Sequence, residues 1–391
     1  MKIPFFSTPK SHELAVILDI GSGVVSGAVV SLPKGGDEFS RPTFFYQTSH
    51  DIACHGTATC EPLKKSMLSA LRLVVNDIAH AHVGIPTRLY CVLASPWCIS
   101  QTRIITLKKI MPFKITSEIA VTLVEKEKKI FSSYVQKQLA KEKSIQSPLV
   151  IETMILSMIC DGVTLYELPK HSIASLELSV AMTVADQHII DEIQGIISTA
   201  FSGKEVLYHS FITASFCVAR DLLSQKRNIL IIDIGGEVSD ISYGKDDVLL
   251  QSISVPFGTH TLMRKATEGG KVTMREFRSL VRMHKSKLLH THIHSHMNIL
   301  WEHLGVAWKE ELRNAIKKLF ISGSLDTMII FADGYTSEWF TDRIREVATE
   351  FDTPVVSLTP ISVYDRYTAA ENVTRDIYTI TDALFLVKRN M

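Results

Sequence analysis

A short glycine-containing motif occurs twice in this chain, each time at the end of an apolar run. The first copy, Leu-Asp-Ile-Gly-Ser-Gly, spans residues 18–23, and the second, Ile-Asp-Ile-Gly-Gly-Glu, spans residues 232–237. The apolar runs at 14–21 and 228–233 predict buried strands, and each turn leads into a second and then a third strand. We interpret the two copies as an internal duplication, which predicts two related α/β domains.

The remaining patterns predict the other elements of these domains. The predicted strands are residues 24–32, 43–48 and 88–94 in the first half and residues 238–243, 248–255, 328–331 and 354–358 in the second half. The predicted helices are residues 61–81, 273–287, 298–320 and 337–350, together with a terminal helix that ends near Val387. Strands and helices alternate, as expected for an α/β fold.

A different kind of module lies between the two halves. Residues 117–142 form a long charged helical stretch, and strands are predicted at 106–112, 157–161 and 175–184. This pattern predicts a small α+β subdomain inserted into the first domain. We therefore expect a first domain of residues 12–95 and 182–225, an inserted subdomain of residues 96–181 and a second domain of residues 226–391.

Composition limits the classes of function. A chain of 391 residues is long enough for two or three domains. Its 42 basic and 41 acidic residues give a net charge of +1, which does not favour nucleic acid as a partner. No apolar run approaches the ~20 residues of a membrane-spanning helix, and no signal peptide is predicted. The six cysteines form no CxxC pair, so we expect a cytoplasmic protein.

The two glycine turns have the chemistry of a phosphate site. A glycine turn between buried strands points several backbone N–H groups into one space, and the missing Cβ lets a phosphate approach. Ser22 and Ser239 add hydroxyl groups, while Asp19 and Asp233 can hold Mg²⁺ through water. Two such turns facing each other across one interdomain cleft would clamp the phosphates of ATP.

These residues resemble the actin, Hsp70 and sugar-kinase superfamily, and within it the FtsA/PilM group. Residues 19–22 and 233–242 resemble its two phosphate motifs, 253–258 resembles the segment after the second motif, and 210–215 lies where the family leads into it. The resemblance implies an actin-like ATPase fold with two ribonuclease-H-like domains and an SHS2-type inserted subdomain. The cofactor-binding residues it implies are Asp19, Gly21, Ser22, Gly23, Asp233, Gly235, Gly236, Glu237, Ser239, Gly258 and Gly334.

Two positions depart from the family pattern. Glu237 stands where the family has a third glycine, so its carboxylate repels phosphate, orients water or Mg²⁺ as a catalytic group, or points away from the site. In the adenosine motif only Gly334 is kept, and Asp333 is expected to crowd the base and ribose. A pseudo-ATPase that keeps the fold for assembly is therefore an alternative to a slow ATPase.

The histidine-rich tract at 290–296 is a further candidate feature. On a strand its four histidines would share one face and offer a Zn²⁺ or Ni²⁺ site. No Asp, Glu or Cys joins them at ligand spacing, so we expect an exposed loop between two helices instead.

The resemblance implies a scaffold rather than a metabolic enzyme. The leading expectation is an ATP-binding protein that polymerises into filaments and links a cytoplasmic assembly to the membrane in cell division, as FtsA does. The alternative is a PilM-like platform protein of type IV pilus assembly, favoured because the chain ends at 386–391 without the membrane helix of FtsA. Partners are expected to be further copies of the chain and a membrane-associated division or pilus protein. A small-molecule kinase is less expected, because no acidic general base is recognisable in the first domain.

Overall fold

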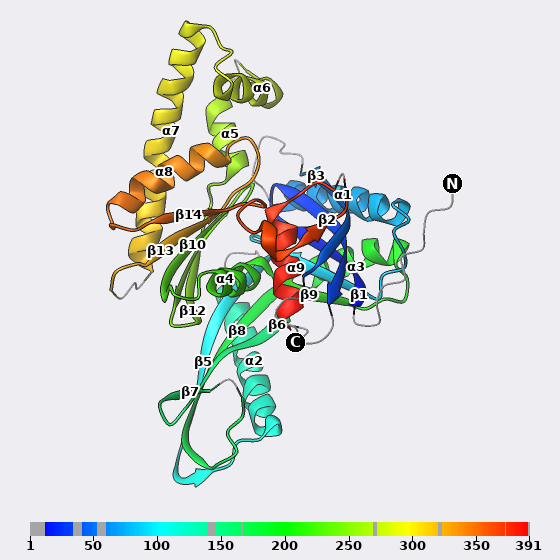
Figure 1. Ribbon diagram of the computed structural model, residues 1–391, viewed down its shortest axis with the longest axis vertical. Coiled ribbons are helices and arrows are strands. Elements are labelled where there is room, and N and C mark those ends of the chain that lie inside the picture. Colours follow the sequence, from blue (N-terminus) through cyan, green and yellow to red (C-terminus); the bar gives the residue numbers. More distant parts are fainter. Residues whose placement is uncertain are drawn as a thin grey trace.

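A computed structural model of the protein describes residues 12–33, 41–52, 60–139, 145–165, 167–268, 272–319, 323–371 and 373–389. Figure 1 shows two sheet-containing domains side by side, with a pair of helices extending beyond one end and a strand-rich module beyond the other. Among the residues described, no helix has both the length and the apolar character needed to cross a membrane.

The first domain is built on a six-stranded sheet of order β15-β3-β2-β1-β4-β9. The strand carrying the first motif pairs antiparallel with the next strand and parallel with β4. The strands are β1 (His12–Ile20), β2 (Val24–Pro33), β3 (Thr43–Asp51), β4 (Arg88–Leu93), β9 (Val206–Ser210) and β15 (Thr368–Ala369). β1 and β2 are buried along most of their length because both faces of the sheet are covered by helices.

The second domain repeats this arrangement in a five-stranded sheet of order β12-β11-β10-β13-β14. Its strands are β10 (Asn228–Ile234), β11 (Ser239–Lys245), β12 (Val248–Val255), β13 (Thr327–Phe331) and β14 (Val355–Leu358). The strand with the second motif again pairs antiparallel with its successor and parallel with a later strand. Because the pairing pattern is the same in both sheets, the predicted duplication is confirmed.

Helices form three layers around the two sheets (Figure 1). The outer face of the first sheet is covered by α1 (Cys60–His80) and α3 (Gln187–Ala200). Between the sheets lie α4 (Phe211–Leu222) and α9 (Ile377–Arg389), which share one apolar core with both domains. The two domains are therefore joined by a continuous buried core rather than by a linker.

The outer face of the second sheet carries a helical subdomain. Its helices are α5 (Thr259–Thr267), α6 (Met274–Lys285), α7 (Thr291–Lys318) and α8 (Ser337–Thr349). Trp301 and Trp308 of α7 are buried in the core beneath it, as their helical spacing predicts. The histidine tract, which the sequence predicts to be a loop, instead forms the first turns of α7. The loop prediction is wrong because the helical pattern continues in the N-terminal direction from Asn298.

The inserted subdomain is a four-stranded sheet of order β5-β8-β6-β7 with one helix on it. Its elements are β5 (Cys98–Phe113), α2 (Ser117–Leu139), β6 (Pro148–Cys160), β7 (Val163–Leu165) and β8 (Ile173–Asp186). β5 and β6 are much longer than predicted, because their pairing with β8 continues through residues without clear alternation. A short helix η1 (Tyr364–Arg366) completes the described secondary structure.

The C-terminal part of the chain returns to the first domain. Thr368 and Ala369 of β15 pair with β3, and α9 packs against β1, β2 and α4. The expected second domain of residues 226–391 included these residues, so its C-terminal boundary lies too far along the chain. Only the pairing partner in space, which local sequence does not reveal, shows where this segment belongs.

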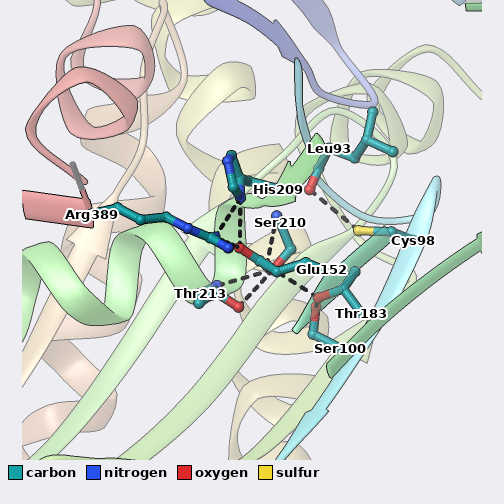
Figure 2. A network of polar contacts seen from close by, with 9 residues as sticks. All are labelled: Leu93, Cys98, Ser100, Glu152, Thr183, His209, Ser210, Thr213 and Arg389. Atoms are coloured by element: carbon teal, nitrogen blue, oxygen red, sulfur yellow. Dashed lines mark hydrogen bonds and ion pairs between the residues drawn. The ribbon is translucent and has the colours of Figure 1, made fainter. Parts of the chain in front are cut away.

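A buried carboxylate ties the inserted subdomain to the first domain and to α9 (Figure 2). The Glu152 side chain on β6 is fully buried, and its Oε1 lies 2.8 Å from His209 Nδ1 and 3.1 Å from an Arg389 guanidinium nitrogen. Its Oε2 accepts hydrogen bonds of 3.0 Å from both the backbone N–H and the hydroxyl of Ser210, at the start of α4. One side chain therefore connects β6, β9, α4 and α9.

This joint is stabilised by charge as well as by hydrogen bonds. Burial alone would raise the pKa of Glu152, but the hydrogen bond from His209 and the charge of Arg389 lower it. A carboxyl group whose pKa is lower in the folded state stabilises the fold above its unfolded pKa, and this contribution is lost as the pH falls.

We predict that Glu152→Gln lowers the free energy of unfolding by about 2 kcal/mol at pH 7. The substitution removes the negative charge that interacts with His209, Ser210 and Arg389. The effect should shrink as the pH falls toward 4. Denaturant unfolding of the variant beside Glu125→Gln, an exposed carboxylate on α2, would measure it. The control should change by less than about 0.5 kcal/mol. Equal stability of the two variants at pH 7 would contradict this role.

Candidate functional site

The two glycine turns lie directly against each other in the cleft between the domains. A Cβ atom added to Gly236 would be 2.4 Å from Gly23 Cα, and one added to Gly23 would be 2.9 Å from Gly236 Cα. Both turns line one cleft of about 370 Å³, and Asp19 and Asp233 line it at the ends of β1 and β10. The prediction that the motifs face one another across one cleft is therefore confirmed, and the volume is typical of a small-molecule site.

The backbone of the second turn is held so that its N–H groups point toward the first turn. The N–H groups of Thr259 and His260, at the start of α5, donate to the carbonyls of Gly235 and Gly236 over 2.9 and 2.7 Å. The amides of Gly236 and Glu237 then point the other way, and both donate to Ser22 Oγ over 3.0 Å. Two convergent amides with an oxygen between them are the arrangement that binds a phosphate oxygen.

This geometry requires glycine at the point of contact. We predict that Gly236→Ala forces the two turns apart, because the new methyl group meets Gly23 backbone. The melting temperature should fall by several degrees, as expected for an overpacked site that costs about 1–3 kcal/mol. Gly195→Ala in α3 is the matched control, since nothing lies within 4 Å of its added Cβ. The control should be neutral or slightly stabilising, and a wild-type melting temperature for Gly236→Ala would contradict the close approach.

Several carboxylates are buried in and next to the cleft. Asp19 and Asp233 are each 6% exposed, and Asp382 of α9 is fully buried behind them. Burial, then the charges of Asp376 and Asp233, raises the pKa of Asp19 well above its usual value. Burial and the charge of Asp240 likewise raise the pKa of Asp233, and burial raises that of Asp376 to about 6.

These carboxylates have the character of a cation site. Asp233 Oδ1 has no hydrogen-bond partner among the described residues, and neither has either oxygen of Asp382. Hard oxygen ligands with unsatisfied charge suit Mg²⁺, which keeps several waters and usually binds through one or two carboxylates. The described part of the chain contains no group of three His, Cys, Asp or Glu side chains arranged to hold a metal directly. The residues therefore fit a hydrated cation held by Asp19 and Asp233 better than a fully protein-ligated one.

We predict that Asp382→Asn stabilises the protein at pH 8 by about 1–2 kcal/mol, because it removes a buried carboxylate without a hydrogen-bond partner among the described residues. Burial raises the pKa of Asp382 in the folded state. Wild-type stability therefore falls as the pH rises from the ordinary pKa of an aspartate toward the raised pKa of the folded state. The gain from the substitution should therefore be largest at pH 8 and small at pH 5. Thermal unfolding at both pH values, with the exposed Asp365→Asn as control, measures it. A gain independent of pH would show that charge is not its cause.

Glu237 points away from the cleft. Its carboxylate accepts hydrogen bonds from both terminal nitrogens of Arg264, one of them over 2.7 Å, and its Oε1 lies 3.4 Å from His260 Nδ1. Burial alone would raise the pKa of Glu237, but these two partners lower it to about 2. Of the alternatives open from sequence, the structure matches the one in which the carboxylate turns away from the cleft.

Two other predicted residues support the second turn from behind. Ser239 Oγ donates to the Phe257 carbonyl over 2.6 Å, so its hydroxyl group is occupied away from the cleft. Gly258 packs so closely that an added Cβ would lie 2.5 Å from the Gly235 carbonyl oxygen. Neither residue lines the cleft.

The other end of the cleft holds the predicted adenosine segment. Gly334 adopts a φ of 80°, and its N–H donates to Asp333 Oδ1 over 2.6 Å, so that carboxylate folds back onto its own loop. Tyr335 lies beneath the guanidinium of Arg278, 5.6 Å from the ring centroid. Arg278 also forms a 3.0 Å ion pair with Asp51 of β3, which links the two domains across the cleft.

The structure brings most of the predicted residues together and adds several that sequence did not indicate. The predicted residues that line the cleft are Asp19, Gly21, Ser22, Gly23, Asp233, Gly235, Gly236 and Gly334. Asp376 and Tyr378 line it from the start of α9, and Tyr378 hydroxyl donates to the Ile234 carbonyl over 3.2 Å. They belong to no motif, so only the return of α9 to the cleft identifies them.

The sequence matches no protein-family model and no curated protein. In structure it is similar to a chain of the PilM–PilN type IV pilus biogenesis complex, with a TM-score of 0.60 and 14% identity over 96% of this chain and 98% of that chain. It is also similar to a protein of unknown function with an actin-like ATPase fold from Bacteroides thetaiotaomicron, with a TM-score of 0.46 and 9% identity over 98% and 99% of the two chains. A third similar structure is the ethanolamine utilization protein EutJ from Carboxydothermus hydrogenoformans, with a TM-score of 0.43 and 10% identity over 97% and 91%. The first of these likenesses shows the fold and confirms the architecture that the resemblance implied.

Proposed function

We propose that this chain, which has the actin-like ATPase fold, is an ATP-binding scaffold that docks on a membrane-associated partner. The observation that carries the proposal is the pair of opposed glycine turns, whose amides converge between two buried carboxylates. Such a site offers N–H donors for phosphate oxygens and charge for a Mg²⁺ ion that bridges them.

Each part of the cleft suits one part of Mg²⁺-bound ATP. The amides of Gly236 and Glu237 would take a phosphate oxygen in place of Ser22 Oγ. Asp19 and Asp233 would hold the hydrated cation. At the far end Tyr335 and Arg278 would adjoin the nucleoside, next to Asp333, whose carboxylate accepts a hydrogen bond from the Gly334 N–H. A bound cation would also favour the ionised forms of Asp19 and Asp233, whose pKa values are raised by burial and then by neighbouring carboxylates.

Scaffolding is the role that the likeness to the PilM–PilN complex favours. By analogy we propose a membrane-anchored protein as partner and a peripheral position at the cytoplasmic face of the membrane. The role in type IV pilus assembly is the form supported by that likeness. The division role of an FtsA-like protein, assembly into filaments and the pseudo-ATPase alternative remain predictions from the sequence.

We predict that the purified chain binds ATP only when Mg²⁺ is present, with hydrolysis below about 1 s⁻¹. Asp19→Asn and Asp233→Asn should each weaken Mg²⁺-dependent ATP binding by about tenfold or more, since each removes charge next to the cation. Isothermal titration calorimetry with and without Mg²⁺ would measure the affinities.

Asp161→Asn, an exposed carboxylate in the inserted subdomain, is the control and should bind ATP as the wild type does. Absence of ATP binding by the wild-type protein would refute the nucleotide-binding role and leave the pseudo-ATPase reading. Rapid turnover on a small-molecule acceptor would instead identify a kinase.

A further inference from the structure

His260 is a buried side chain that faces the point where the two glycine turns meet. Its side chain is 4% exposed, yet the residue lines the cleft. The ring atom Cε1 lies 3.9 Å from the position of a Cβ added to Gly23. It therefore stands beside the contact between the two turns, where the amides of Gly236 and Glu237 converge on Ser22 Oγ.

The Glu237 carboxylate lies beside the Nδ1 edge of the His260 ring. His260 Nδ1 lies 3.4 Å from Glu237 Oε1, and Arg264, one turn later on α5, holds the Glu237 carboxylate through two nitrogens. The backbone N–H of His260 is fixed to the Gly236 carbonyl at the start of the same helix. With Nδ1 directed at Glu237, the opposite ring nitrogen, Nε2, is the one left to face a ligand in the cleft.

The geometry points to a specific role for this histidine. We propose that His260 contacts the terminal phosphate of a nucleoside triphosphate in the cleft, and that Glu237 and Arg264 position its ring. The proposal rests on the proposed nucleotide-binding function and extends it. Glu237, which replaces a glycine of the family pattern, thereby becomes a positioning residue for a phosphate contact instead of an obstacle to phosphate.

The terminal phosphate is the group that reaches this point. The nucleoside would lie at the end of the cleft formed by Gly334 and Tyr335, so the phosphate chain extends from there toward the two turns. His260 and the amides of the second turn lie at the turn–turn contact, toward which that phosphate chain would run. A nucleoside diphosphate would leave this position empty. A contact there would therefore make the protein bind nucleoside triphosphates more tightly than diphosphates.

The test compares ATP and ADP affinities, both with Mg²⁺. The variants distinguish the contribution of the Nδ1 edge of the His260 ring from that of the Nε2 edge. His260→Asn keeps an amide nitrogen facing Glu237 but removes the edge that faces the cleft. His260→Gln reaches the position of Nε2 and should partly restore the contact. The exposed His303→Ala, on α7, serves as the matched control. Calorimetry with the full chain gives each dissociation constant, and melting temperatures verify folding.

We expect His260→Asn to weaken ATP binding about tenfold or more, as for a lost hydrogen bond to a charged group, while ADP binding changes less than about twofold. Glu237→Gln should shift the ATP-to-ADP ratio in the same direction by a smaller factor. His260→Gln should recover part of the loss. A purely structural role would weaken both nucleotides equally, and that result would overturn the proposal.

Two negative outcomes are distinguishable. If the wild-type protein binds ATP and ADP but His260→Asn keeps the wild-type ratio, the histidine contact is refuted while the nucleotide-binding function stands. If the wild-type protein binds neither nucleotide, both the function and the contact are refuted.

Discussion

The close approach of two backbones at Gly23 and Gly236 is the constraint on which the rest of the cleft depends. Each domain contributes one turn, and a Cβ atom added to either glycine would collide with the backbone of the other turn. The start of α5 binds the carbonyls of the second turn, which leaves its amides to face the first turn. The suitability of the site for the proposed phosphate ligand therefore follows from backbone geometry, and serine, aspartate and histidine side chains surround it.

Much of this architecture could be predicted from sequence because it rests on local patterns. The buried runs before Asp19 and Asp233, the glycines after them and the turn with left-handed Asp246 and Asp247 between β11 and β12 are all local signals. The duplication then made it possible to place two distant motifs in one cleft. The loop prediction for the histidine tract was wrong because the local pattern there shows no helical spacing of apolar residues. The helix extends through the tract, and its first buried residue is Met297.

The features that could not be predicted depend on partners far apart in the chain. Asp376 and Tyr378 reach the cleft only because α9 crosses back to the first domain. The orientation of the Glu237 side chain depends on Arg264, 27 residues later, whose guanidinium binds the Glu237 carboxylate away from the cleft. A departure from a family pattern is thus ambiguous in sequence alone, because its effect is set by a compensating residue that no motif includes.

Helix α9 connects two places that perform different tasks. At its first turn Tyr378 touches the second glycine turn, and at its last turn Arg389 enters the Glu152 joint of the inserted subdomain. Thirteen helical residues span about 20 Å and bend little over that length. The helix therefore connects the two sites rigidly, so a rigid-body displacement of the end at the cleft would be transmitted to the base of the inserted subdomain.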